Sequence, residues 1–153
     1  MKIPGKQYII LILFILALAL RSWHIAADRR WTGDEGFHVP AAMNYTLNGQ
    51  TGPFWHHPPF QHVILSGFMK VLGNNPYGWR LRNVIFGALT VLILMLLAKE
   101  MFADTRTTVL AGVMLALDPL HILFSRATAG EISAALLYLT SIYFTMRFLA
   151  GNR

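Results

Sequence analysis

The sequence predicts an all-α integral membrane protein with about four transmembrane helices and two amphipathic juxtamembrane helices in the first outside loop. Three observations predict this class. Apolar residues make up 55% of the 153 residues, and charged residues only 13%, about half the share that a soluble domain carries. Separate apolar runs follow one another, and all four tryptophans lie between positions 23 and 79. This composition excludes a disordered chain, and the length fits a single module over residues 1–153.

The net charge of +6 comes from 13 basic and 7 acidic side chains. A basic balance is compatible with nucleic-acid binding, but it is commoner in membrane proteins, whose spans are flanked by Lys and Arg. We therefore expect the lipid bilayer, and no nucleic acid, as a partner. The sequence has no cysteine, so it offers no thiolate site and no indication of the redox compartment.

The first predicted span covers residues 8–27 and follows two lysines. Its unbroken apolar run ends at Leu20, short of the about 20 helical residues that cross a bilayer core, so the helix has to continue to Ala27. Arg21 then lies near the outer end, where its side chain can snorkel to the headgroups. The alternative is a cleaved signal peptide with Ala26 and Ala27 at the cleavage site. We favour a retained helix, because further spans follow.

Three more spans are predicted over residues 83–99, 107–124 and 132–150. The first of these is framed by basic residues. The last has an acid just before it and an arginine in its final turns, which suits the helix dipole. The middle span contains Asp118-Pro119, where we expect a break, because proline lacks an N–H and disfavours helix in the residue before it.

Residues 28–82 form the predicted outside loop. Tryptophan gathers at membrane–water interfaces, so we expect this loop to lie folded on the membrane surface. Two amphipathic helices are predicted within it, over residues 35–48 and 59–72. Arg80 and Arg82 are expected to be membrane anchors. The density of bases in the short segments favours a cytoplasmic N-terminus, which places the loop on the outer side of an inner or plasma membrane.

The clearest candidate site is the acidic pair Asp34-Glu35, just outside the first span. Adjacent carboxylates beside a bilayer are costly unless they are solvated or have a function. The pair is interpreted either as a helix start, with Asp34 as the N-cap, or as catalytic groups. Glu35 and His38 also have a spacing found in metal-binding helices. A divalent metal held by them with His56 and His57 is therefore an alternative to the expectation of no cofactor.

Five further side chains are candidates for substrate binding: His38, His56, His57, Arg126 and Glu131. His56 and His57 precede two prolines, which form a rigid turn, and either imidazole can serve the acidic pair as a hydrogen-bond donor or ligand. Arg126 and Glu131 lie at the outer start of the last span. A guanidinium at the membrane surface suits a phosphate headgroup, and the alternative is that it only snorkels.

An ordered set of short motifs runs through the chain: Asp34-Glu35, Ala41-Ala42, His57-Pro58-Pro59-Phe60, Leu72-Gly73, Arg80-Leu81-Arg82 and Ser125-Arg126. Over about residues 8–150 this order resembles the N-terminal part of GT-C membrane glycosyltransferases of the protein O-mannosyltransferase and aminoarabinose transferase type. The resemblance implies that Asp34 is the catalytic base, that the first loop forms two juxtamembrane helices, and that the sugar donor is carried on a polyprenyl phosphate.

The side chains are compatible with an inverting glycosyltransferase. A lipid phosphate leaves as an anion, so one carboxylate that deprotonates the acceptor is enough, here Asp34 oriented by Glu35 or by a histidine. Members of the resembled family are longer, which implies a partner chain, a fragment or a reduced relative. The alternative functions are a non-catalytic subunit that scaffolds or binds lipid in a larger membrane complex, and a metal-binding membrane protein.

Overall fold

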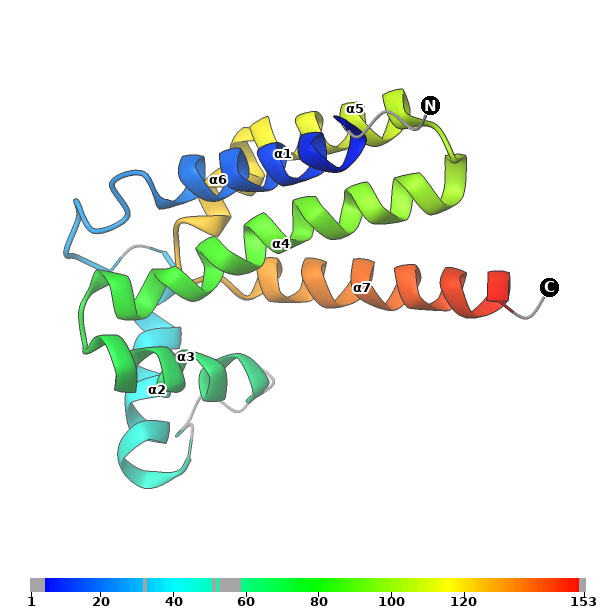
Figure 1. Ribbon diagram of the computed structural model, residues 1–153. Helices are drawn as coiled ribbons and strands as arrows, with labels where there is room; N and C mark the ends of the chain where they lie inside the picture. The colour runs from blue at the N-terminus through cyan, green and yellow to red at the C-terminus, as the bar shows by residue number, and fades with distance from the viewer. Residues whose placement is uncertain (1–4, 32, 51, 53–58, 152–153) are drawn as a thin grey trace.

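The computed structural model describes residues 5–31, 33–50, 52 and 59–151. These residues form seven helices and no strand (Figure 1), which confirms the all-α class. In chain order the helices are α1 (Gly5–Ser22), α2 (Glu35–Asn48), α3 (Phe60–Leu72), α4 (Pro76–Phe102), α5 (Thr105–Leu117), α6 (Pro119–Ser125) and α7 (Gly130–Gly151).

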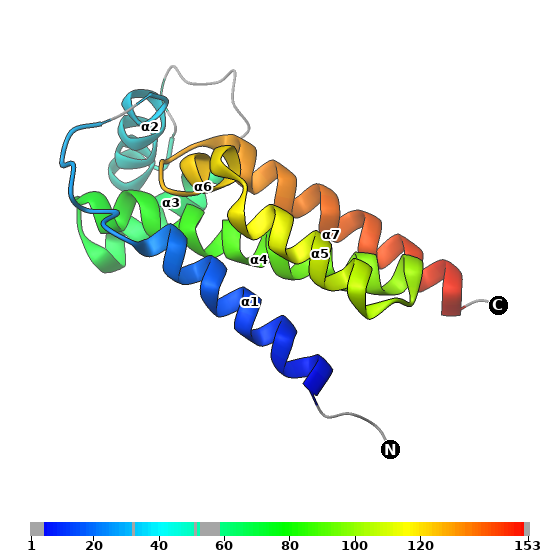
Figure 2. The ribbon, with the colours of Figure 1, turned by 90° about the horizontal axis from the view of Figure 1, so that it is seen from above.

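Helices α1, α4, α5 and α7 form a bundle in which α4 contacts each of the other three (Figures 1 and 2). Its core contains Leu13, Ala17, Ala88, Val91, Met95 and Ala116. Small residues let the helix backbones approach closely, as is common where helices pack within a membrane. A Cβ added at Gly112 would lie 2.6 Å from the sulfur of Met95, so the absence of a side chain at Gly112 leaves room for Met95 between α4 and α5.

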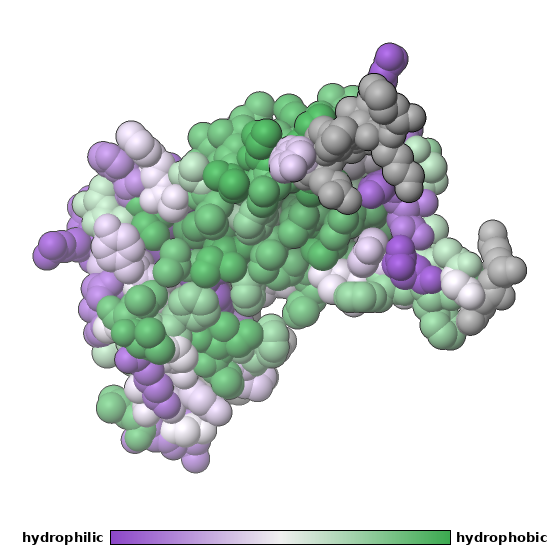
Figure 3. Space-filling view, viewed as in Figure 1, coloured by the Kyte–Doolittle hydropathy of each residue, from purple (hydrophilic) through white to green (hydrophobic). Residues whose placement is uncertain are grey.

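Two helices, α4 and α7, are long and apolar enough to cross a membrane, and the bent pair of α5 and α6 is a third candidate. The members of this pair are bent by 59°, which confirms the predicted break at Asp118-Pro119. Apolar residues cover the middle of the bundle in Figure 3, and polar residues gather toward its ends. These are the features of an all-α integral membrane protein. Helix α1 is apolar but shorter than the span predicted for it.

The predicted first span of residues 8–27 is wrong at its outer end, because α1 stops at Ser22. His24 has a φ of 54°, in the left-handed region that interrupts a helix. Ile25 is buried, and its carbonyl accepts a hydrogen bond of 2.7 Å from Nη1 of Arg80. This long-range contact holds the chain after α1 against the start of α4.

Arg21 does not snorkel, because its side chain is fully buried between α1 and the broken span. Pro119 has no N–H, so the carbonyl of Leu115 loses its helical partner. Nη2 of Arg21 donates to this carbonyl at 3.1 Å, and Nη1 donates to the carbonyl of Ala116 at 3.2 Å. Nη2 also donates to Nδ1 of His121 at 2.7 Å. The guanidinium therefore supplies hydrogen bonds that the break removes.

Helix α4 begins at Pro76, earlier than the residue 83 that the sequence predicted. Asn75 caps it with a side-chain oxygen that accepts hydrogen bonds from two backbone N–H groups of the first turn, and proline suits the first helical position. The added turns carry Arg80 and Arg82. Both side chains are buried, so the expectation that they anchor the protein to the membrane surface is wrong.

Helices α2 and α3 lie where the sequence predicted amphipathic helices, at one end of the bundle. Pro40 lies within α2, and Gly49 ends the helix in the left-handed conformation at a φ of 70°. The two helices pack on each other and on the start of α4 around Val39, Ala42, Leu65, Met69 and Trp79. This layer brings the start of α2 close to the start of α7.

Candidate functional site

Asp34 stands at the start of α2 with an exposed side chain. Its backbone carbonyl accepts hydrogen bonds of 3.0 Å from the N–H groups of Phe37 and His38, so the backbone alone begins the helix. The side chain makes no capping hydrogen bond with the described residues. The interpretation of Asp34 as a side-chain N-cap is therefore wrong, and its carboxylate faces a pocket instead.

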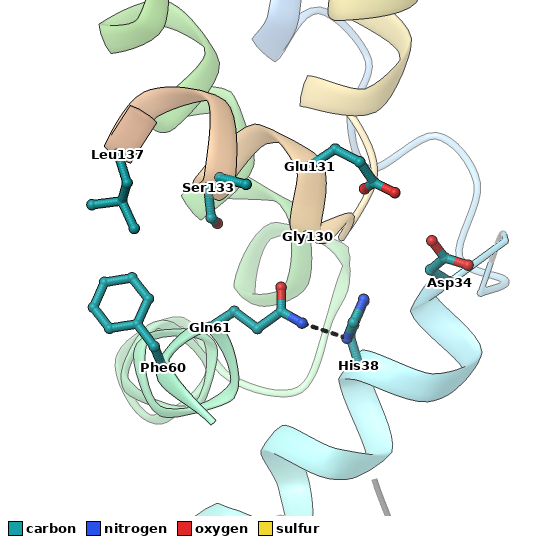
Figure 4. A pocket seen from close by; sticks show the side chains of 9 residues that line it. Asp34, His38, Phe60, Gln61, Gly130, Glu131, Ser133 and Leu137 are labelled. Atoms are coloured by element: carbon teal, nitrogen blue, oxygen red, sulfur yellow. Dashed lines mark hydrogen bonds between the residues drawn. The ribbon is translucent and has the colours of Figure 1, made fainter. Parts of the chain in front are cut away.

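This pocket, which we call the acidic pocket, has a volume of about 350 Å³ and lies between the starts of α2, α3 and α7 (Figure 4). Its polar lining residues are Asp34, His38, Gln61, Glu131 and Ser133. Figure 4 shows both carboxylates and His38 on one side, and Phe60 and Leu137 on the other. The pocket can therefore hold a ligand that is polar at one end and apolar at the other.

Glu35, the neighbour of Asp34, is fully buried. Its two carboxylate oxygens accept hydrogen bonds from Nε and Nη2 of Arg80 at 2.7 Å each, which makes a bidentate ion pair. One of these oxygens also accepts from the backbone N–H of Thr128 at 3.1 Å. Glu35 thus joins the start of α2 to α4 and to the segment before α7. Charge-assisted pairs of this geometry are strong, so Glu35 fixes the backbone that presents Asp34.

Arg80 and Arg82 hold the backbone around the acidic pocket. The N–H groups of Arg80 that do not bond the carboxylate donate to three carbonyls in the segment after α1. Arg82 donates through Nη1 to the carbonyl of Gln61 at 2.8 Å, and through Nη2 to the carbonyl of Ala129 at 3.4 Å. A buried guanidinium needs such acceptors to offset its lost hydration. Both arginines therefore act inside the protein.

His38 and His62 form a buried pair behind the pocket. Nδ1 of His38 lies 3.0 Å from Nε2 of His62, and the side-chain amide of Gln61 lies 3.3 Å from the same Nδ1. Both contacts are hydrogen bonds when Nδ1 of His38 accepts and Nε2 of His62 carries a proton. The proton of His38 is then on its other nitrogen, which points toward the acidic end of the pocket in Figure 4.

Ser133 lies in the first turn of α7 with only 4% of its surface exposed. Its hydroxyl has no hydrogen-bond partner among the residues that the structure describes. In Figure 4 the side chain projects into the pocket between Leu137 and Gln61. A buried hydroxyl without a partner costs free energy, so a ligand group that bonds it gains that free energy on binding.

The other predicted site residues are only partly brought together. Glu131 lines the acidic pocket. Arg126 does not line it, because Nη2 of its guanidinium donates to the carbonyl of Trp23 at 2.6 Å and ties it to the end of α1. His56 and His57 lie outside the described residues.

Glu35 and His38, the two described residues of the alternative metal site, take different partners. Glu35 turns toward Arg80, and His38 turns toward His62. In the described part of the chain, no group of three or more His, Asp or Glu side chains is placed to hold a metal ion.

The segment between α1 and α2 carries a local ion pair at its surface. The backbone N–H of Arg30 donates to Asp28 at 2.9 Å, and its guanidinium donates to both carboxylate oxygens at 3.2 Å. These hydrogen bonds, the side-chain ones above all, lower the pKa of Asp28. The backbone carbonyl of Asp28 accepts from Arg80 at 2.8 Å, so this pair lies beside the contacts that hold Glu35.

Gln61 and Ser133 line the pocket without any signal in the sequence, and Phe60 belongs to a sequence motif but was not among the candidate site residues. Phe60 and Gln61 start a predicted helix, where an aromatic and an amide side chain carry no particular signal. Ser133 lies two residues after Glu131, but only the position of α7 next to α2 shows that both face the same pocket.

Comparisons with known proteins identify related chains. Residues 56–153 match the family described as dolichyl-phosphate-mannose-protein mannosyltransferase. A polyprenol-phosphate-mannose–protein mannosyltransferase of Corynebacterium glutamicum is 30% identical over 104 residues, which are 61% of this chain and 20% of that protein. An uncharacterized protein of Aquifex aeolicus is 26% identical over 150 residues, 94% of this chain and 30% of that protein. This chain thus spans a minor part of both relatives. No solved structure matches.

Proposed function

Because this chain belongs to the dolichyl-phosphate-mannose-protein mannosyltransferase family, we propose that it is a module of a membrane glycosyltransferase whose sugar donor is carried on a polyprenyl phosphate. The activity in the name of its 30% identical relative supports this donor class. The structural observation that carries the proposal is the exposed carboxylate of Asp34, which faces the acidic pocket beside a fully anchored Glu35.

In the proposed reaction Asp34 is the general base. Its carboxylate removes the proton from an acceptor hydroxyl, whose oxygen forms a bond to the anomeric carbon of the sugar. The bond from that carbon to the phosphate oxygen breaks, and the lipid phosphate leaves with the electron pair. A single displacement of this kind inverts the anomeric centre. An anionic leaving group needs no second acid to protonate it, which separates this scheme from the two-carboxylate chemistry of glycosidases.

Glu35 is the proposed positioning residue for Asp34. It is buried and hydrogen-bonded on both carboxylate oxygens, so it has no access to a substrate and acts through the backbone. His38 lies one helical turn after Asp34 and lines the same pocket, and we assign it to substrate binding with Glu131. His56 and His57 keep their proposed substrate-binding roles as sequence-based assignments.

The donor phosphate and its prenyl chain need a cation and an apolar surface. Arg126 is the proposed phosphate partner in this chain. Only 11% of the most apolar 18-residue stretch of α7 is buried. We propose that further helices, from the same protein or from a partner chain, cover part of α7 and complete the donor site, with the loop of residues 28–82 on the outer side of an inner or plasma membrane.

The test is transfer of mannose from polyprenyl-phosphate mannose by purified membranes that hold the chain with its co-purifying partners. Asp34→Asn should lower the rate by at least about 100-fold, the usual contribution of a general base. Asp104→Asn is the matched control, because Asp104 caps α5 at the opposite end of α4 and should leave the rate unchanged.

This assay distinguishes a glycosyltransferase module from a non-catalytic subunit. An Asp34→Asn protein that is as active as the parent removes Asp34 from the role of base. A stable complex that transfers no sugar with any acceptor favours the second candidate, a non-catalytic subunit, which the mostly exposed apolar surface of α7 supports.

A further inference from the structure

The charges around the acidic pocket have one sign. Asp34 and Glu131 line it, and no Lys or Arg does so among the described residues. The two arginines that hold the backbone around the pocket are already bound: Arg80 by Glu35, and Arg82 by the carbonyls of Gln61 and Ala129. A phosphate monoester or diester placed here would meet like charges and find no cation. The local field therefore disfavours an anion.

The hydrogen-bonding groups of the pocket require a ligand that both donates and accepts. Carboxylates only accept, so Asp34 and Glu131 need a donor from the ligand. Ser133 is only 4% exposed, and its hydroxyl has no hydrogen-bond partner among the described residues. This hydroxyl can donate or accept a hydrogen bond with the ligand. Hydroxyl groups on the ligand satisfy both demands. Ser133 is the observation that marks the pocket as a binding site, since it leaves a buried polar atom to be matched.

The apolar side of the pocket sets a further requirement for the ligand. Phe60 and Leu137 lie opposite the carboxylates in Figure 4, and Ser133 projects between the two ends. A ligand that fills the pocket therefore presents hydroxyl groups to Asp34 and Glu131 and an apolar part to Phe60.

We propose that Glu131 and Ser133 make the acidic pocket, where the proposed function already places the acceptor hydroxyl, selective for uncharged or cationic groups, and that the phosphate of the donor lies outside the pocket. The assignment to the acceptor rests on the proposed function. The exclusion of anions rests on the pocket alone, so it is tested without any transfer reaction.

The charge selectivity is measured with a single cysteine, which this cysteine-free chain allows. Ala134 lines the pocket and is exposed, so Ala134→Cys places a small thiol there. The thiol is labelled with a cationic (trimethylammonium-ethyl) and an anionic (sulfonato-ethyl) methanethiosulfonate. Asn48→Cys, on an exposed and uncharged turn of α2, gives the reference ratio of the two rates.

Relative to Asn48→Cys, the cysteine at position 134 should favour the cationic reagent by about ten-fold at low salt. Addition of Glu131→Gln should reduce this preference several-fold, because it removes one carboxylate and leaves the shape unchanged. An equal rate for both reagents, or a faster anionic one, overturns the proposal. Glu131 is exposed, so its substitution leaves the fold intact, which elution of the labelled protein from a sizing column checks.

The ligand class is tested by protection of the same cysteine. N-acetylthreonine amide and methyl mannoside are the two uncharged probes, and they distinguish a peptide source of the hydroxyl from a sugar source. At least one should slow labelling, and Ser133→Ala should weaken its protection several-fold. Phosphorylated forms of both probes should not protect. The proposal is overturned if a phosphorylated probe protects the cysteine as well as its parent does. It is also overturned if neither uncharged probe protects. Both results are independent of sugar transfer.

Discussion

Replacement of Arg21 by methionine should destabilise the bundle by about 2 to 4 kcal/mol. Methionine keeps an unbranched side chain but removes every donor. The carbonyls of Leu115 and Ala116 lie in the last turn of α5, where a helix supplies no N–H. A buried acceptor without a partner costs about 1 to 3 kcal/mol, so two give about 2 to 6 kcal/mol. The desolvation of the guanidinium, which the substitution relieves, reduces this sum.

The free energy of unfolding can be measured in mixed micelles by circular dichroism as a denaturing detergent is added. Arg147→Met is the matched control. The side chain of Arg147 is 59% exposed and lies 3.5 Å from Glu100, so its replacement should change stability by less than about 0.5 kcal/mol.

A double-mutant cycle tests whether the cost of Arg21→Met comes from the carbonyls that the break at Pro119 leaves without a partner. In a Pro119→Ala chain, residue 119 regains the N–H that can reach the carbonyl of Leu115, so Arg21→Met should cost less there than in the parent. We expect a coupling of about 1 kcal/mol. A cost below about 0.5 kcal/mol for Arg21→Met, or strict additivity with Pro119→Ala, would refute the reasoning.

Three further predictions concern other contacts. Glu35→Gln should destabilise the protein by about 3 kcal/mol in chemical unfolding, because Arg80 stays buried beside a neutral amide. Gly87→Ala should destabilise by about 1 to 3 kcal/mol, measured in the same way, because the added Cβ overlaps a side chain on α6. Hydrogen bonds from Thr107 lower the pKa of Asp104, so the carboxylate stabilises the start of α5 at neutral pH and loses this effect as the pH falls through the lowered pKa. Amide hydrogen exchange at the start of α5 should therefore rise in acid in the parent chain, but not in Asp104→Asn.

The apolar pattern predicted most helices because burial in a membrane depends on continuous apolar stretches. The last span, predicted over residues 132–150, is α7 with two more residues at its start and one at its end. The break at Asp118-Pro119 followed from the missing N–H of proline, a purely local cause. The local sequence was therefore enough to predict both the last span and the break.

The arginines show where this reasoning fails. Arg21, Arg80 and Arg82 were all expected to face the headgroups, because a charge near a helix end can reach water there. Each is instead buried against carbonyls or a carboxylate that are distant in the sequence. A sequence does not show which carbonyls the fold leaves without a partner, so it does not show which arginines will serve them.

The candidate site was predicted in part. Asp34 was identified because adjacent carboxylates beside a membrane are costly unless they have a function, and Glu131 because it follows Arg126 at the start of the last span. Both line the acidic pocket. Glu35 and Arg126 were also candidates, but neither faces this pocket: Glu35 bonds Arg80, and Arg126 bonds the carbonyl of Trp23. Adjacent acids such as Asp34 and Glu35 look equivalent in the sequence, and only the position of Arg80 on α4 decides which of them is buried.

The hydrogen bonds of Arg21 have a consequence for biosynthesis. The carbonyl of Ala116 follows Arg21 by 95 residues, so a nascent chain that has released α1 still holds an unmatched guanidinium on an apolar helix. The guanidinium therefore stays at the lipid surface, or beside the insertion machinery, until the ribosome has made α5. The contacts of Arg21 with the broken span are therefore complete only after α5 has been made.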